Sequence, residues 1–376
     1  MTERRARAWR RPGFTALVAL AALAAAPAGG GFSGGTVKKE KVVLQLKWVT
    51  QAQFAGYYAA KAKGCYDQAG LDVVISAGGP DVVPEQVVLD GKAQFAIDWL
   101  PSLMATRDKG GDIVNIAQLF NRSSIAEVVW KDTGITSFCQ LRNRKVGVWM
   151  NGYQFEQFAA LQRCGIDPFD KQQVTIVAQP FSMEPLLKRQ LDAVAADTYN
   201  ELPLVLETRN PKTGKLFQLS ELNVFKMQDQ GTGMLEDGIF VKGSWLKSPK
   251  NQDAATRFLE ASFKGWIYCR DHLADCTKIV LKNAPTLGKS HQTWQMNEIN
   301  ALIWPASAAG IGVMDAASFA RTSSIAQKFK ILKKAPSGAY VDLYARAAVA
   351  DLKKQGIDVV GAGWKKATVT VTAGGR

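Results

Sequence analysis

Residues 42–76 read VVLQLKWVTQAQFAGYYAAKAKGCYDQAGLDVVIS and place two strand signals around one helix signal. The apolar run 42–48 predicts a buried strand. Apolar side chains at i, i+4 spacing predict a helix over 53–64 that stops at Gly64. The run 71–76 predicts a second strand. Strand, helix and strand in this order are typical of an open α/β sheet.

The junction within this stretch, residues 46–60, is crowded with aromatic and amide side chains and carries almost no charge. Trp48 can stack on a planar ring, and Gln51 and Gln53 can bind the hydrogen-bonding edge of such a ring. Tyr58 shares a helical face with the apolar residues and is expected to pack in the core. The composition therefore indicates a site for a planar, mostly neutral ligand.

The alternation of strand and helix signals continues along the chain. Strands are expected at 93–99, 112–120, 127–131, 144–150 and 238–243, helices at 84–92, 102–111 and 152–165, and a mostly helical region at 250–356. With 376 residues, 47% of them hydrophobic, the chain is long for one simple domain. We therefore expect two α/β lobes with open sheets and a ligand cleft between them.

The first 28 residues have the pattern of a secretory signal peptide, with five arginines, an apolar run and small residues before Ala28. A membrane anchor is the alternative, but the apolar run is shorter than the roughly 20 residues of a membrane span. We expect cleavage after Ala28, a linker over 29–37, and a protein in the periplasm or on the extracellular face of the membrane. The formal net charge is +14. The basic residues outside the signal are scattered along the chain, so no nucleic-acid partner is expected.

The five cysteines are compatible with export, because disulfides form in oxidising compartments. Cys269 and Cys276 are seven residues apart and can join a helix end to the following turn. The pairing of Cys65, Cys139 and Cys164 stays open. With two histidines and no C-x-x-C motif, neither a zinc site nor another metal site is expected.

Several motifs resemble one family of proteins. The stretch 46–99, together with IVNIAQLF, VVWKDTGI, KVGVW and TYNE further on, is similar to the substrate-binding proteins of ABC importers in the thiamine-pyrimidine family. That family also has riboflavin-binding members and is related to fungal pyrimidine synthases. The similarity covers roughly residues 41–245.

The resemblance implies a type II periplasmic binding-protein fold, in which two lobes are joined by two crossing segments. Lobe one would comprise 38–131 and 239–345, lobe two 132–238, and a C-terminal extension 346–376. Gly134 and Gly238 would serve as hinges. A monomer that closes on its ligand and docks on a membrane permease is the expected working unit.

Most candidate site residues follow strands, where ligands bind in open α/β sheets. Trp48, Trp99, Trp149 and Tyr199 are candidates for stacking, Gln51, Gln53, Asp98, Asp197, Asn200 and Glu236 for contacts to the ring edge, and Gly79 for backbone N–H groups. Five more tryptophans, Trp130, Trp245, Trp266, Trp294 and Trp304, are interpreted as structural.

The first ligand hypothesis is a thiamine pyrimidine precursor, the second is riboflavin, and a sulfonate ranks below both. A hypothesis of another class is a pyridoxal-phosphate-consuming pyrimidine synthase. The family's cofactor lysine and its histidine align with Asp98 and Ser102, and a carboxylate cannot form a Schiff base. We therefore expect a binding protein without a cofactor rather than an enzyme.

Overall fold

Strand β1 (Glu40–Gln45) pairs in parallel with β2 (Leu71–Ser76) on one side and β3 (Phe95–Trp99) on the other. The parallel pairing of β1 with β2 follows from the strand–helix–strand order of the opening stretch. The computed structural model describes residues 39–150 and 153–376. The expected signal peptide (1–28) and linker (29–37) lie outside the described residues.

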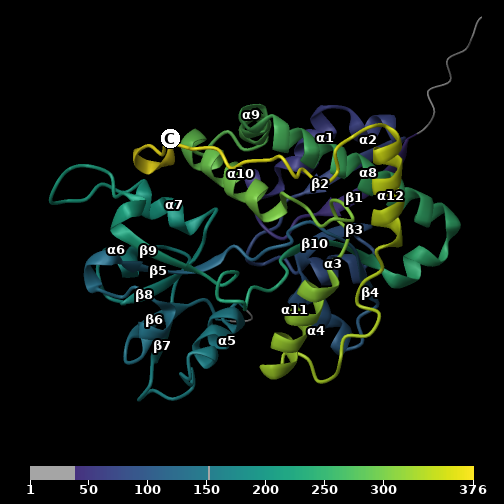
Figure 1. Cartoon of the computed structure of the whole chain (residues 1–376). Coiled ribbons are helices and arrows are strands. Elements are labelled where there is room, and N and C mark those ends of the chain that lie inside the picture. Colours follow the sequence, from purple (N-terminus) through teal and green to yellow (C-terminus); the bar gives the residue numbers. More distant parts are fainter. Residues whose placement is uncertain (1–38, 151–152) are drawn as a thin grey trace, which may run out of the picture. The chain divides into compact units, whose positions relative to one another are not determined.

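The described strands form two five-stranded sheets (Figure 1). The first has the order β2-β1-β3-β10-β4 and adds β10 (Asp237–Lys242) and β4 (Ile113–Gln118) to the three parallel strands. Strand β10 runs antiparallel to both of its neighbours, β3 and β4. A strand from late in the chain is thus inserted into a sheet built mostly by the first 118 residues.

The second sheet has the order β7-β6-β8-β5-β9. Its strands are β5 (Ile125–Trp130), β6 (Lys145–Val148), β7 (Thr175–Ala178), β8 (Ala193–Asp197) and β9 (Leu222–Lys226). Strand β6 is parallel to β7 and β8, whereas β5 is antiparallel to β8 and β9.

The first crossing between the sheets differs from the sequence expectation. The chain passes from β4 to β5 over 119–124, ahead of the expected crossing near 131–134, because β5 forms its hydrogen-bond ladder with β8 and β9. Gly134 caps a short 3-10 helix with a φ of 74°. Gly238 lies inside β10, where a Cβ would stand 2.3 Å from Asn115 Nδ2. Both glycines therefore have local structural reasons that do not involve a hinge.

Helices accompany both sheets. Around the first sheet lie α1 (Ala55–Ala62), α2 (Cys65–Gln68), α3 (Pro84–Leu89), α4 (Leu100–Asp108), α8 (Pro249–Asp271), α9 (Leu273–Asn283), α10 (Lys289–Ile303), α11 (Ala316–Lys328) and α12 (Leu343–Lys354). The second sheet carries α5 (Phe155–Arg163), α6 (Glu184–Leu187) and α7 (Glu201–Leu206).

The C-terminal third completes the core of the first sheet. Helix α8 packs against α1 and α12 (Figure 1). The contact with α1 is close: a Cβ on Gly265 would lie 2.0 Å from the carbonyl oxygen of Gly56. Trp266 is fully buried and meets Tyr57 edge-on at 5.4 Å between ring centroids. The glycine pair therefore lets two helices far apart in sequence approach at backbone distance.

The last residues of the chain run along α10 and reach α7. The backbone of Ala367 exchanges two hydrogen bonds with the side chain of Asn297 on α10. Farther on, the amide of Gly374 donates to the carbonyl oxygen of Glu207, at the end of α7. The expected extension 346–376 is therefore packed on both sheet-bearing halves of the protein.

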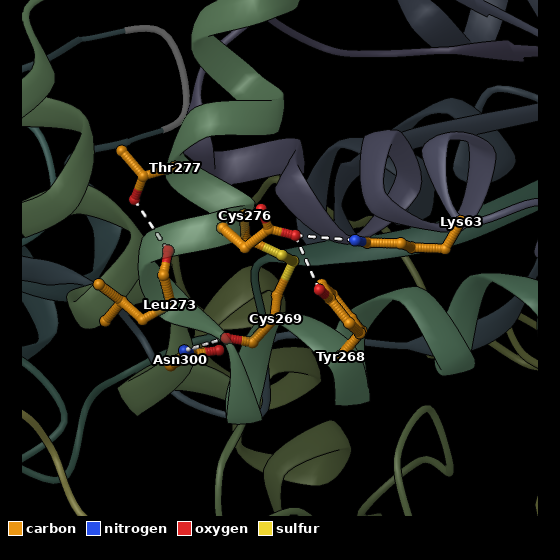
Figure 2. The surroundings of a disulfide bond; sticks show 8 residues. Lys63, Tyr268, Cys269, Leu273, Cys276, Thr277 and Asn300 are labelled. Atoms are coloured by element: carbon orange, nitrogen blue, oxygen red, sulfur yellow. Dashed lines mark hydrogen bonds and ion pairs between the residues drawn. A yellow bond between two sulfur atoms is a disulfide. The ribbon is translucent and has the colours of Figure 1, made fainter.

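Two disulfides are present. Cys269 and Cys276, the pair that the sequence spacing favours, join the end of α8 to α9 (Figure 2). Beside this bond, Asp275 accepts a hydrogen bond from Tyr268 and forms an ion pair with Lys63, at the end of α1. The second disulfide joins Cys139 to Cys164 and was not predicted from the sequence. Cys65 forms no disulfide.

Within the described residues, no helix combines the length and apolar character that a membrane span requires. In the same part of the chain, no three histidine, cysteine or acidic side chains cluster in a way that could hold a metal ion.

Candidate functional site

A cavity of about 230 Å³ lies at the carboxyl ends of the parallel strands of both sheets. We call it the aromatic cavity; it is lined by Lys47, Trp48, Gln51, Gln53, Trp99, Tyr153, Phe181, Asp197, Tyr199, Asn200 and Glu201. Its residues follow β1, β3, β6, β7 and β8. Because parallel strands deliver their carboxyl ends to one edge of a sheet, side chains far apart in sequence meet there.

Aromatic rings supply the apolar surface of this cavity. The rings of Trp48 and Phe181 lie 5.8 Å apart, and Phe181 is 58% exposed although it is a large apolar side chain. Trp99 and Tyr153 meet edge-on with centroids 4.7 Å apart. The half-buried Trp48 and the exposed Phe181 offer ring faces that a planar ligand can cover.

Lys47 is the only cationic side chain among the described residues that line the aromatic cavity. Its ammonium lies 3.2 Å from Asp98 Oδ1 and 4.1 Å from the centroid of the Trp99 ring. Burial opposes the charged form, but Asp98, Tyr153 and Asp237 outweigh it and raise the pKa of Lys47. Lys47 is therefore a protonated, paired ammonium rather than a free amine.

The two glutamines of the opening stretch form one hydrogen-bonded chain. Gln51 Nε2 donates to Gln53 Oε1 at 2.8 Å, and Gln53 Nε2 donates to Asp237 Oδ2 at 2.9 Å. Burial, partly offset by Lys47 and Gln53, raises the pKa of Asp237 to about 7. Within the described residues Gln51 Oε1 accepts no hydrogen bond, so it remains available to a ligand N–H group.

On the opposite wall, Ser124 joins two acidic side chains. Its hydroxyl lies 2.5 Å from Asp197 Oδ1 and 2.8 Å from Glu236 Oε1. The single hydroxyl proton of Ser124 therefore lies within reach of both carboxyl groups. Burial raises the pKa of Asp197 and, together with the charge of Asp197, that of Glu236. Behind Asp197, this wall therefore has a second buried carboxyl group, that of Glu236.

Asn200 and Glu201 complete that wall. Asn200 Nδ2 donates to Glu201 Oε1 at 2.7 Å, and the backbone amide of Asp197 donates to Glu201 Oε2. Burial, then the charge of Asp197, raises the pKa of Glu201 to about 8. From α10, Gln295 Nε2 donates to Asn200 Oδ1, and His291 Nε2 lies 3.3 Å from the same oxygen. The wall is therefore tied to a helix that packs with the first sheet.

The structure brings seven of the eleven candidate residues into the cavity lining: Trp48, Gln51, Gln53, Trp99, Asp197, Tyr199 and Asn200. Trp149 and Glu236 are buried and do not line the cavity. Trp149 Nε1 donates to the carbonyl oxygen of Pro180, and the Trp149 ring packs on the ring of Phe181. Asp98 lines a neighbouring cavity.

Gly79 does not line the cavity. In the same turn, it is Gly78 that approaches the backbone of β1's end closely, since a Cβ on Gly78 would lie 2.3 Å from the carbonyl oxygen of Leu46. The glycines therefore let the turn pack on the end of β1.

Sequence reasoning missed Lys47, Tyr153, Phe181 and Glu201. Lys47 is the only charge in the opening junction, Tyr153 lies at the start of the predicted helix 152–165, and Glu201 ends the motif TYNE. These positions were available as signals. Phe181 follows β7 and had no comparable signal, because its role depends on which strands share an edge.

A family model described as NMT1/THI5 like matches residues 51–274, more than half of the chain. The chain belongs to the NMT1/THI5-like family. Over 158 residues this family member is 27% identical to a Haemophilus influenzae protein named for thiamine biosynthesis, a match covering 42% of this chain and 49% of the relative. It is 24% identical over 248 residues to the riboflavin-binding protein RibY of Chloroflexus aurantiacus, covering 64% of this chain and 66% of that protein. The chain thus matches about half to two thirds of the length of these relatives.

Solved structures show the fold. A protein of Methylobacillus flagellatus named a periplasmic sulfonate-binding protein of an ABC transporter aligns with a TM-score of 0.61 at 14% identity, over 89% of this chain and 99% of that one. The two mixed α/β sheets match this architecture. The predicted type II periplasmic binding-protein fold is therefore confirmed, while so low an identity leaves the ligand open.

Proposed function

We propose that this protein is the exported substrate-binding protein of an ABC importer and captures a small aromatic nitrogen heterocycle. A thiamine pyrimidine precursor is the preferred ligand. The observation that supports this proposal is the aromatic cavity, which combines aromatic ring faces with carboxyl groups and one paired ammonium group. An aminopyrimidine has two ring faces that can stack on aromatic side chains. Its exocyclic amine can donate a hydrogen bond to a carboxylate such as that of Asp197.

The charge of the cavity argues against a sulfonate. Lys47 is already paired with Asp98, Asp197 and Glu201 line the cavity, and the Asp237 carboxyl group lies behind Gln53. An anion would have to displace an internal ion pair and approach several acidic groups, which is unfavourable in a buried site. The likeness to a sulfonate-binding protein concerns the fold and does not support a sulfonate ligand here.

Riboflavin is the second candidate, supported by the similarity to RibY. The volume of about 230 Å³ is below the roughly 300–1,000 Å³ typical of sites for drug-sized ligands. A single ring with short substituents therefore suits the observed cavity better than a three-ring flavin does.

Delivery to a permease is part of the proposal. Export is supported by the two disulfides, which form in oxidising compartments. The cavity is lined from both sheets, so ligand binding would favour the closed arrangement of the two lobes that a membrane permease recognises.

Calorimetry with the mature chain tests the ligand. An aminopyrimidine of the thiamine type should bind, an alkanesulfonate should not, and riboflavin should bind more weakly or not at all. Trp48→Ala should weaken aminopyrimidine binding about two- to tenfold, because one stacking face is lost. Val49→Ala, a change at the exposed neighbouring residue, is the matched control. Absence of binding of both heterocycles at millimolar concentration would refute the ligand assignment.

The synthase alternative has its own test, since a shared fold does not by itself exclude catalysis. Schiff-base formation requires a neutral amine, whereas Lys47 is held as an ammonium by Asp98. Incubation with pyridoxal phosphate should give no Schiff-base absorbance. An absorbance band that Lys47→Ala abolishes would favour the enzyme.

A further inference from the structure

A second cavity of about 320 Å³ adjoins the aromatic cavity, and Trp99 and Tyr153 line both. We call it the acidic compartment; its polar lining includes Glu85, Asp98, Ser102 and Lys109. Trp99 ends β3, and Tyr153 precedes α5 on the second sheet's side. The dividing wall is therefore built by one aromatic residue from each half of the protein and exists only where the halves meet.

Glu85 is the unusual residue of this compartment. It is 3% exposed, and its Oε1 has no hydrogen-bond partner among the described residues. A buried carboxyl oxygen without a donor is costly, because its lost hydration is not replaced. Burial, and after it the neighbouring Asp98 carboxyl, raise the pKa of Glu85 to about 8. Glu85 is thus a buried carboxyl group with one oxygen that no donor occupies, close to the Asp98 carboxyl group and to the charge of Lys47.

Neither of the two nearby lysines, Lys47 and Lys109, forms an ion pair with Glu85. The Lys47 ammonium already lies 3.2 Å from Asp98 Oδ1. Lys109, on the rim, is exposed, so solvent screens its charge. Trp99 adds a second unpaired group, since its Nε1 is also buried without an acceptor in the described part of the chain. Two lining residues of the compartment therefore carry a buried polar atom without a hydrogen-bond partner in the described part of the chain, Glu85 Oε1 and Trp99 Nε1.

We propose that the acidic compartment binds a primary ammonium group carried on a side chain of the ligand whose ring occupies the aromatic cavity. Glu85 and Asp98 accept its hydrogen bonds, and Tyr153 closes behind the side chain when the two halves come together. The inference rests on the proposed function and specifies its substrate class: a heterocycle with an amine-bearing substituent. Glu85 is then the residue that distinguishes amine from hydroxyl substituents.

The test uses two synthetic 4-amino-2-methylpyrimidines with the same short side chain, one ending in a primary amine and one in a hydroxyl group. Calorimetry on the mature protein should give about tenfold or greater preference for the amine, because a hydrogen bond to a charged group is worth more than a neutral one. Glu85→Gln should lower the affinity for the amine analogue and so remove this preference. Glu184→Gln, at an exposed glutamate, should alter neither affinity.

The outcomes separate the two proposals. Binding of the hydroxyl analogue without an amine preference, or a preference that persists in Glu85→Gln, overturns this inference alone. Failure of both analogues to bind the wild-type protein refutes the proposed function and this inference with it. Gln has the shape of a protonated Glu, so the variant is expected to fold, and a cooperative urea-unfolding transition like that of the wild-type protein would verify this.

Discussion

The ammonium of Lys47 and the carboxylate of Asp98 form an ion pair 3.2 Å long at the boundary between two cavities. The side chains are 9% and 13% exposed, so the pair is nearly cut off from water. Lys47 follows β1 and Asp98 lies near the end of β3, which are neighbours in the first sheet. Strand pairing thus places a cation and an anion, 51 residues apart, between the aromatic cavity and the acidic compartment.

Removing one member of this pair should destabilise the protein strongly. Asp98→Ala leaves the Lys47 ammonium buried without its main partner and is expected to lower the free energy of unfolding by roughly 3–5 kcal/mol. Urea denaturation measures this change. As a control, Glu184→Ala breaks the exposed pair with Lys188 and should cost less than about 1 kcal/mol. Equal effects of the two variants would contradict the buried role of the pair.

Stability should decrease as the pH rises from about 4.5 to 8, partly because of Glu156. This residue is buried, accepts hydrogen bonds from Ser123 and from the amide of Met234, and has its pKa raised by burial to about 8. The unfolded carboxyl ionises near its ordinary value of 4.5, so in this range the folded state binds more protons. The stability that protonated Glu156 contributes is therefore fully present below about pH 4.5 and is lost as the pH approaches 8.

Glu156→Gln tests this linkage, because it keeps the shape of the protonated side chain but cannot titrate. Urea unfolding at pH 5, 6, 7 and 8 should show a shallower loss of stability in the variant, by up to about 1.4 kcal/mol per pH unit. Glu184→Gln, at an exposed position, should leave the slope unchanged. An unaltered slope in Glu156→Gln would show that Glu156 does not titrate differently on folding.

Each disulfide should stabilise the fold through the loop that it closes. Cys139 and Cys164 are separated by 25 positions and Cys269 and Cys276 by 7, so the first bond restricts the unfolded chain more. Replacing Cys139 and Cys164 together by serine should cost about 3–4 kcal/mol in urea unfolding. Cys65→Ser, at the cysteine outside both bonds, is the control and should change little. A loss below about 1 kcal/mol in the double variant would contradict the prediction.

The contact between α10 and α7 should influence ligand affinity. His291 Nδ1 lies 3.1 Å from both carboxylate oxygens of Glu207, and its Nε2 lies 3.3 Å from Oδ1 of Asn200, a residue of the aromatic cavity. His291→Ala should weaken binding of an aminopyrimidine about three- to tenfold, since hydrogen bonds that orient Asn200 are lost. Calorimetry measures this. Thr293→Ala, on the same helix, is the control and should leave the affinity unchanged. Equal affinities in the wild-type protein and both variants would refute the role of His291 in orienting Asn200.

The sequence by itself determined the elements and the places where ligand groups could lie. Alternating strand and helix signals follow from the side-chain periodicities of 2 and 3.6, which are local properties. Strand ends face the ligand in open α/β sheets, so Trp48, Gln51, Asp197 and Asn200 could be chosen without coordinates. The pairing of Cys269 with Cys276 was also accessible, because only seven positions separate them.

Tertiary structure decided what depends on contacts between distant segments. Strand β5 joins the second sheet because its ladder partners, β8 and β9, come later in the chain, and no local pattern encodes that choice. Lys47 meets Asp98, Phe181 meets Trp48, and Glu85 is buried beside Asp98 only because separate strands and helices end at one edge. Side-chain periodicity sets the faces of each element, whereas the charge and shape of the site arise from which elements become neighbours.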